Sequence, residues 1–184
     1  MPTIFTHAVL PIALGIGLGA RRIPRRLMAA GAVAAMLPDF DVLAFKLHIA
    51  YADTFGHRGA THSIAFALLV GAAAMLLARR LRARPSVVFL FMAGSAFSHG
   101  VLDMLTNGGL GVALAWPLSN ERLFLPWRLI EVSPIGMRFL SSRGWQVIQS
   151  EMLWVWLPAA CMAAALVWIR AAGGARAGDP AARQ

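Results

Sequence analysis

The sequence carries little charge for its length. Only 14% of its 184 residues are charged, whereas 59% are hydrophobic. In an average soluble domain, about 25% of the residues are charged and about 45–50% are apolar. A chain of this size cannot bury so much apolar surface in a water-soluble core, so we expect lipid to solvate part of it. Cysteine is nearly absent as well. Because Cys161 is the single cysteine, an internal disulfide is excluded. Its apolar neighbours in the sequence indicate a packing role.

Acidic residues are scarce: eight Asp and Glu stand against 17 Lys and Arg, which gives a formal net charge of +9. The positive charge is concentrated in short groups at 21–26, 79–84 and 170–183. Such groups beside apolar helices mark the cytoplasmic side of a membrane. A nucleic-acid-binding protein would instead need a basic patch with base-reading residues. We therefore attribute the charge to membrane topology and expect no nucleic-acid partner.

Five apolar segments indicate membrane helices. Because a spanning helix needs about 20 apolar residues, four segments qualify and the second is too short by itself. The first is expected to be a retained helix, because its positive charges follow it. The sequence predicts an all-α, polytopic membrane bundle of about five transmembrane or membrane-embedded helices at 1–172, and a disordered polar tail at 173–184. The segments are 3–20, 27–37, 62–78, 86–105 and 147–170.

The same segments predict a topology. With the basic groups inside, five alternating spans place the amino terminus outside and the carboxyl terminus in the cytoplasm. Eleven of the 17 basic residues then lie on the inner side. The long connection at 110–146 falls on the outer side and contains three tryptophans and three prolines. Since tryptophan favours the membrane interface, we expect this connection to form a lid or a lipid-contacting ledge.

Histidines and acids gather at the predicted outer ends of these segments. His99 and Asp103 are four residues apart on a helix, so their side chains share a face. Asp39 and Asp41 flank Phe40, and in a turn or an extended conformation both would point the same way. Four of the five histidines and three of the eight acids thus converge on one membrane face: His7, Asp39, Asp41, His57, His62, His99 and Asp103.

This set predicts a metal site. Imidazole and carboxylate together suit Zn²⁺, with Mn²⁺ or Fe²⁺ as alternatives, and ionisable groups at membrane depth are costly and usually functional. Seven ligands exceed the need of one tetrahedral ion, so one or two ions are expected. Singly, each residue has a simpler interpretation: packing for His7, a turn or cap for Asp39 and Asp41, and a structural hydrogen bond for His99 and Asp103.

The predicted activity is hydrolysis with a metal-activated water as the nucleophile. Asp39 is the preferred ligand, and Asp41 would then act as a general base. Arg58 either steadies a phosphate with its planar guanidinium or anchors the chain at the interface. A site at the lipid–water boundary favours a phosphoester in a lipid or lipid-linked substrate. The alternative is a non-enzymatic metal-binding membrane protein or a transporter, although apolar inner helix halves disfavour transport.

Other polar residues are expected to have structural roles. Thr61 or Ser63 would cap the helix that follows. Five further residues carry no motif and are expected to be solvated or interfacial: His48, Asp53, Glu121, Glu131 and Glu151.

The motifs resemble a known family. Thr6-His7, Pro38-Asp39-Phe40-Asp41, the stretch 57–63 and the stretch 98–103 are similar, in roughly residues 1–110, to the YdjM-type family of membrane-bound, metal-dependent hydrolases. The resemblance implies a location in the bacterial inner membrane and a reaction class, without a substrate.

A more distant likeness is to zinc-dependent phospholipase C and the related single-strand nucleases, which share the order His, Asp, His, His-x-x-x-Asp. That likeness implies the same metal ligands in this chain. Their later histidine and His-x-x-x-Glu ligands have no counterpart, because no histidine follows His99. One or two metal ions are therefore expected, and not three.

Overall fold

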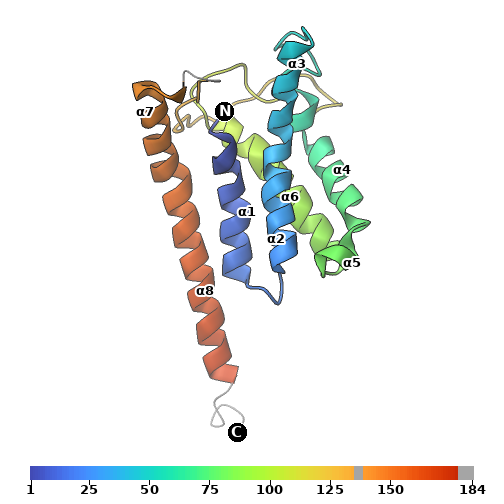
Figure 1. Ribbon diagram of the computed structural model, residues 1–184, viewed down its shortest axis with the longest axis vertical. Helices are drawn as coiled ribbons and strands as arrows, with labels where there is room; N and C mark the ends of the chain where they lie inside the picture. Colours follow the sequence, from blue (N-terminus) through green and yellow to red (C-terminus); the bar gives the residue numbers. More distant parts are fainter. Residues whose placement is uncertain (135–138, 178–184) are drawn as a thin grey trace.

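The computed structural model describes residues 1–134 and 139–177. This part of the chain forms a helical bundle (Figure 1) with two isolated β-bridges. The predicted all-α membrane bundle is confirmed. Its principal helices are α1 (Ile4–Leu18), α2 (Arg25–Met36), α4 (Ile64–Met75), α6 (Pro85–Met104), α7 (Ser142–Glu151) and α8 (Leu157–Ala177).

The second apolar segment is longer than its sequence suggested. Helix α2 continues into the 3₁₀-helix η1 (Leu37–Val42) and then into α3 (Leu43–Lys46). The whole stretch, Arg25–Lys46, has 22 residues and is long and apolar enough to cross a membrane. Pro38 stands in the first turn of η1, where it cannot donate a hydrogen bond to the preceding turn of α2. The expectation of a segment too short to span was therefore wrong, because the two aspartates are wound into the helix and do not end it.

Helices α1 and α4 are shorter than predicted, at 15 and 12 residues. Helix α1 ends at Gly19, whose φ of 82° is one that glycine adopts without strain. Helix α4 begins after Ser63, whose hydroxyl accepts a hydrogen bond from the Phe66 amide, and it ends before the short helix α5 (Ala78–Leu81). The expectation that the first and third segments reach spanning length was therefore wrong. Among the described residues, the helices of spanning length are Arg25–Lys46, Pro85–Met104 and Ser142–Gly173.

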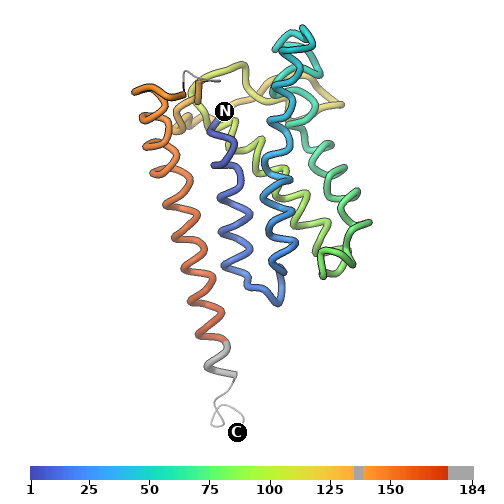
Figure 2. Tube along the Cα trace, viewed as in Figure 1, coloured from blue at the N-terminus to red at the C-terminus, as the bar shows by residue number. Residues whose placement is uncertain are grey.

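Helix α6 is the centre of the bundle. It packs against α4, α2 and α1, while α1 also packs against α8; Figure 2 shows α6 crossing obliquely behind α1 and α2. Close approach depends on glycine: a Cβ at Gly31 of α2 would lie 2.3 Å from the Phe91 ring of α6. An apolar cluster that includes Leu27 of α2 and Val88 and Phe91 of α6 forms the core between these helices.

The two ends of the bundle differ in charge. The loops with Arg21, Arg22, Arg82 and Arg84 line one cavity at the end where α1 gives way to α2. The opposite end is covered by residues 105–134, which are tied down by backbone hydrogen bonds such as that from Ala113 to the Arg58 carbonyl. The basic loops and the histidine- and aspartate-bearing segments therefore lie at opposite ends, as the topology requires. Which end faces the cytoplasm stays a prediction.

The carboxyl-terminal part is one long helix. Helix α7, the π-helix η4 (Met152–Trp156) and α8 follow one another directly, and α8 lies against α1 (Figure 1). The expected domain boundary at residue 172 falls inside α8, which continues to Ala177. Residues 178–184 lie outside the described residues, so their disorder stays a prediction.

Candidate metal centre

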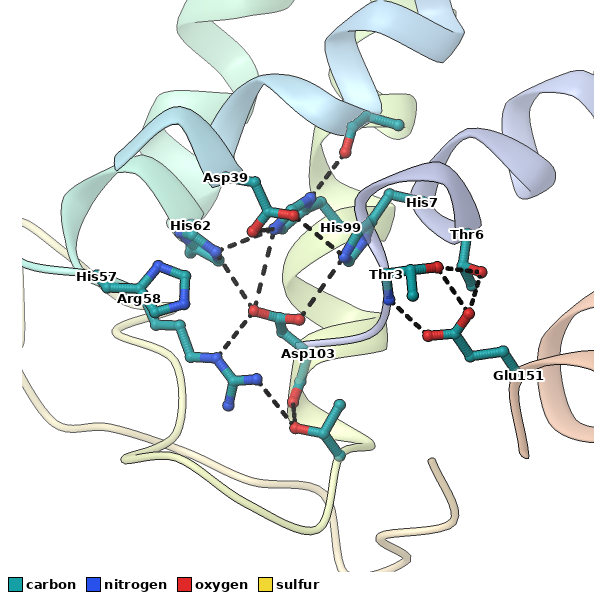
Figure 3. A network of polar contacts seen from close by, with 12 residues as sticks. Thr3, Thr6, His7, Asp39, His57, Arg58, His62, His99, Asp103 and Glu151 are labelled. Atoms are coloured by element: carbon teal, nitrogen blue, oxygen red, sulfur yellow. Dashed lines mark hydrogen bonds and ion pairs between the residues drawn. The ribbon is translucent and has the colours of Figure 1, made fainter. Parts of the chain in front are cut away.

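Four side chains meet under the loops that cover one end of the bundle. Asp39, His62, His99 and Asp103 are all buried, and one nitrogen or oxygen atom from each lies within 4.8 Å of the others. Figure 3 shows these atoms pointing toward one another, with Asp103 in the middle. His7 of α1 joins them, because its Nε2 lies 3.7 Å from both Asp39 and Asp103. Five of the seven predicted residues therefore form one central group.

Helix α6 supplies two members of this group and makes room for a third. His99 Nε2 and Asp103 Oδ2 are 3.9 Å apart, which confirms the prediction that both lie on one helix face. Between them in sequence, Gly100 would place a Cβ 2.8 Å from the backbone carbonyl of His62. The absence of that Cβ lets the 3₁₀-helix η2 (Ala60–His62) lie directly on α6.

The hydrogen-bond partners of the histidines orient both rings. His99 Nδ1 lies 2.7 Å from the Ala35 carbonyl, which can only accept, so this nitrogen carries the proton. His62 Nδ1 lies 3.1 Å from the Asp41 carboxylate and is protonated for the same reason. The Nε2 atoms of the two rings then face each other at 2.9 Å. Such a contact between two lone pairs is unfavourable unless a proton or a metal ion lies between them.

His62 precedes α4 and titrates far from its ordinary range. Burial lowers its pKa, but the Asp103 and Asp41 carboxylates bonded to its two nitrogens outweigh burial and raise the pKa to about 9. In the metal-free protein the ring therefore holds a second proton near neutral pH. That proton supplies the positive charge between His62 and His99.

The centre also contains buried polar atoms whose hydrogen-bonding capacity is unused. Among the described residues, both oxygens of Asp39 and both ring nitrogens of His7 are buried without an aligned hydrogen-bond partner, an arrangement that costs free energy. Ligands about 2.0–2.2 Å from a tetrahedral ion lie about 3.3–3.6 Å apart. His99 Nε2 is 3.4 Å from Asp39 Oδ1, and His62 Nε2 is 3.3 Å from Asp103 Oδ2. The donor set therefore fits a divalent cation.

Asp41 belongs to a separate group on the other side of His62. Its two oxygens contact His57 Nδ1 at 2.5 Å, the Arg58 amide at 3.1 Å, the Thr61 hydroxyl at 2.7 Å and His62 Nδ1. These contacts use the approximately four lone-pair positions of a carboxylate. The extended or turn conformation in which Asp39 and Asp41 could point the same way is not present: both lie in the 3₁₀-helix η1, whose three residues per turn separate positions two apart.

Arg58 lies inside the site, where neither water nor lipid reaches its side chain. Its side chain is fully buried, and its Nε is 3.0 Å from Asp103 Oδ2. Its two terminal nitrogens donate to the Gly108 carbonyl at 2.9 Å and to the Thr106 hydroxyl at 3.1 Å. The alternative of an interfacial anchor is therefore wrong. A role in binding phosphate stays a prediction, since the observed donors contact the protein itself.

Glu151 is the residue that the sequence analysis placed wrongly. It was expected to be solvated or interfacial, but its side chain is fully buried. It accepts hydrogen bonds from the Thr3 amide, from the Thr3 hydroxyl at 2.7 Å and from the Thr6 hydroxyl at 2.6 Å, and Figure 3 shows this cluster beside His7. Trp156 Nε1 also donates to Thr6, at 2.8 Å. The only sequence signal was an acid within an apolar segment.

These features define a helical membrane protein with a buried histidine–aspartate centre at one end of its bundle. The chain belongs to the YdjM inner membrane protein family, whose model matches residues 1–175. It is 48% identical to Inner membrane protein YbcI of Escherichia coli (strain K12) over 172 residues, which cover 92% of this chain and 99% of that protein. No solved structure gives a significant match. The family resemblance seen in roughly residues 1–110 thus extends over nearly the whole chain.

Proposed function

We propose that this protein is a divalent-metal-dependent hydrolase that cleaves a phosphoester in a lipid or lipid-linked substrate. The observation that carries the proposal is the convergence of Asp39, His62, His99 and Asp103, whose buried atoms form a mixed nitrogen and oxygen donor set. That set suits Zn²⁺ best, with Mn²⁺ or Fe²⁺ as alternatives. When bound, such an ion supplies Lewis acidity toward a phosphoryl oxygen and lowers the pKa of a coordinated water.

The central group would hold one ion. His62 and His99 would bind through Nε2, because the Asp41 carboxylate and the Ala35 carbonyl occupy their Nδ1 hydrogens. Asp39 and Asp103 would provide oxygens, and His7 is placed to be a fifth ligand. A ring held by a carboxylate or carbonyl at its second nitrogen is the usual arrangement of a metal-binding histidine.

Asp41 and Arg58 are assigned positioning roles in this proposal. Asp41 orients His57 and His62, since its oxygens already accept bonds from the surrounding chain. This role replaces the ligand or general-base role predicted from the sequence. Arg58 fixes the Asp103 carboxylate through its Nε and balances part of the negative charge of the centre. The backbone of Arg58 is left-handed, with a φ of 63°.

The apolar interior of the bundle supports a hydrolase over a transporter. A transport path needs polar groups from one side of the membrane to the other. In the described part of the bundle, the interior between the metal centre and the basic loops is occupied by an apolar cluster that includes Leu27, Val88 and Phe91. With the basic loops in the cytoplasm, the centre would face the outer side of the inner membrane.

Turnover of defined lipids tests the proposal. Detergent-purified protein is loaded with Zn²⁺ or Mn²⁺ and incubated with phospholipids and lipid-linked phosphoesters, and released headgroups are measured by mass spectrometry. We expect metal-dependent release that falls by at least about a hundredfold in Asp39→Asn and persists in Asp53→Asn, a change at an exposed residue. Full activity of Asp39→Asn would contradict the proposal. Stoichiometric metal without release of any headgroup would favour a non-enzymatic metal-binding protein.

A further inference from the structure

A cavity of about 510 Å³ opens beside the candidate metal centre. Its walls come from residues 1–5 at the start of the chain, from η1, from residues 133–134 and Phe139, and from α7 and η4. Its volume lies within the roughly 300–1,000 Å³ typical of small-molecule sites. The lining residues that matter for its chemistry are Ile4, Phe5, Asp39, Val42, Ile148 and Trp156.

The cavity is apolar except where it meets the centre. Among the described residues that line it, Asp39 has the one charged side chain, and Asp39 is only 2% exposed. The apolar lining reaches the outer surface of the protein at Phe5, whose side chain is 71% exposed. A ligand that filled this space would thus have an apolar body and a polar end at Asp39.

The walls of the cavity are held together by the Glu151 cluster. Glu151 joins α7 to Thr3 and Thr6 at the start of α1, and Trp156 of η4 donates to the same Thr6. These bonds fix α7 and η4 against α1 at the depth of His7. The cavity is therefore a formed part of the fold, with a fixed separation between its apolar walls and the metal centre.

We propose that this cavity holds one hydrocarbon chain of the lipid phosphoester and thereby places the phosphate beside the metal ion that Asp39 would help to hold. The inference rests on the function proposed for the metal centre and adds the part of the substrate that the centre does not contact. A chain that leaves the bilayer for the cavity exchanges one apolar surrounding for another, so it gains little hydrophobic free energy. The cavity contributes position, because a phosphate misplaced by about 1 Å can lower the rate by on the order of a hundredfold.

Photo-crosslinking tests this inference without turnover. Purified protein in vesicles of bacterial phospholipid is labelled with a phospholipid that carries a diazirine in one acyl chain, and labelled peptides are mapped by mass spectrometry. We expect labels at Ile4, Phe5 and Val42, and a marked reduction of those labels in Ile148→Trp, which narrows the cavity. The matched control is Leu153→Trp, a residue that is 54% exposed and does not line the cavity. If Ile148→Trp does not fold, Val42→Phe on the opposite wall serves the same purpose.

The outcomes separate the cavity from the chemistry. Labelling that Ile148→Trp reduces, in protein that binds metal but hydrolyses nothing, supports the cavity and contradicts the hydrolase. Labelling confined to the outer surface of α8, or unchanged in Ile148→Trp and Val42→Phe, overturns the cavity. In that case metal-dependent hydrolysis of a short-chain phosphoester would still support the proposed function. Metal content should be equal in the wild type and all three variants.

Discussion

The Nε2 atoms of His62 and His99 lie 2.9 Å apart, although each ring already directs its Nδ1 hydrogen at an oxygen. Two lone pairs do not approach this closely without a positive charge between them. In the metal-free protein a second proton on His62 supplies that charge, and a metal ion would replace it. The same two nitrogens therefore bind either a proton or a metal ion, and this competition has measurable consequences.

Metal affinity should rise with pH. Because the pKa of His62 is raised to about 9 in the metal-free protein, the ion displaces one proton at lower pH. The apparent affinity should increase by about tenfold per pH unit below pH 9 and level off above it. The raised pKa also contributes to the folding stability of the metal-free protein, with the opposite pH dependence. This contribution is fully present below pH 6.5 and is lost as the pH rises through 9. Competition titrations with a chelator measure the affinity, and an affinity independent of pH from 6.5 to 9 would contradict this account.

Asp41→Asn should weaken metal binding without abolishing it. The substitution removes the carboxylate that orients His62 and His57 but leaves the central donors in place. Loss of such an orienting group typically lowers metal affinity by about 10–100-fold. Asp39→Asn, which removes a central donor, should lower it much further. Isothermal titration of both variants decides the roles, and equal losses would return Asp41 to the set of ligands.

Gly100→Ala should damage the centre, whereas Gly94→Ala in the same helix should not. A Cβ at position 100 would lie 2.8 Å from the His62 carbonyl, while a Cβ at position 94 has no heavy atom within 4 Å. The alanine at 100 must push η2 away from α6 and move His62 from His99. We expect at least about tenfold weaker metal binding in Gly100→Ala and wild-type binding in Gly94→Ala. Unchanged binding in both variants would mean that the position of His62 is not critical.

Glu151→Gln should destabilise the packing of the carboxyl-terminal helix on α1. The carboxylate accepts three hydrogen bonds from Thr3 and Thr6, and an amide offers a single accepting oxygen. Hydrogen bonds between membrane helices contribute about 0.6–2 kcal/mol each, so the unfolding midpoint should fall by several degrees. Glu121→Gln, at an exposed residue, is the control. A thermal midpoint equal to that of wild type would show that the cluster does not hold the helices together.

The site could be found from the sequence because two independent patterns agree. Basic loops set the topology, and that topology brought His99, Asp103 and the other candidates to one face without reference to their chemistry. Helical periodicity then placed His99 and Asp103 together, which the structure confirms. Such patterns are local, so they can be recognised in the sequence without knowledge of tertiary contacts.

The remaining features depend on contacts that no local pattern encodes. The partner of Glu151, Thr6, is 145 residues away in sequence, so nothing nearby predicts its burial. The side chains of Asp39 and Asp41 point in different directions because η1 is a 3₁₀-helix. The sequence motif alone does not distinguish this conformation from a turn. The helical stretch Arg25–Lys46 continues through the motif for the same reason, and the length of the second apolar segment was therefore underestimated.

Metal content is the most direct test of the central claim. Detergent-purified wild type is compared with His99→Ala and Asp103→Ala by elemental mass spectrometry, with Gly94→Ala as the control for a change in the same helix. The account predicts one zinc or manganese ion per chain in the wild type and the control, and none in the other two variants. Absence of stoichiometric metal from the wild type, even after reconstitution, would contradict it and leave the five buried side chains as a hydrogen-bonded network of the bundle.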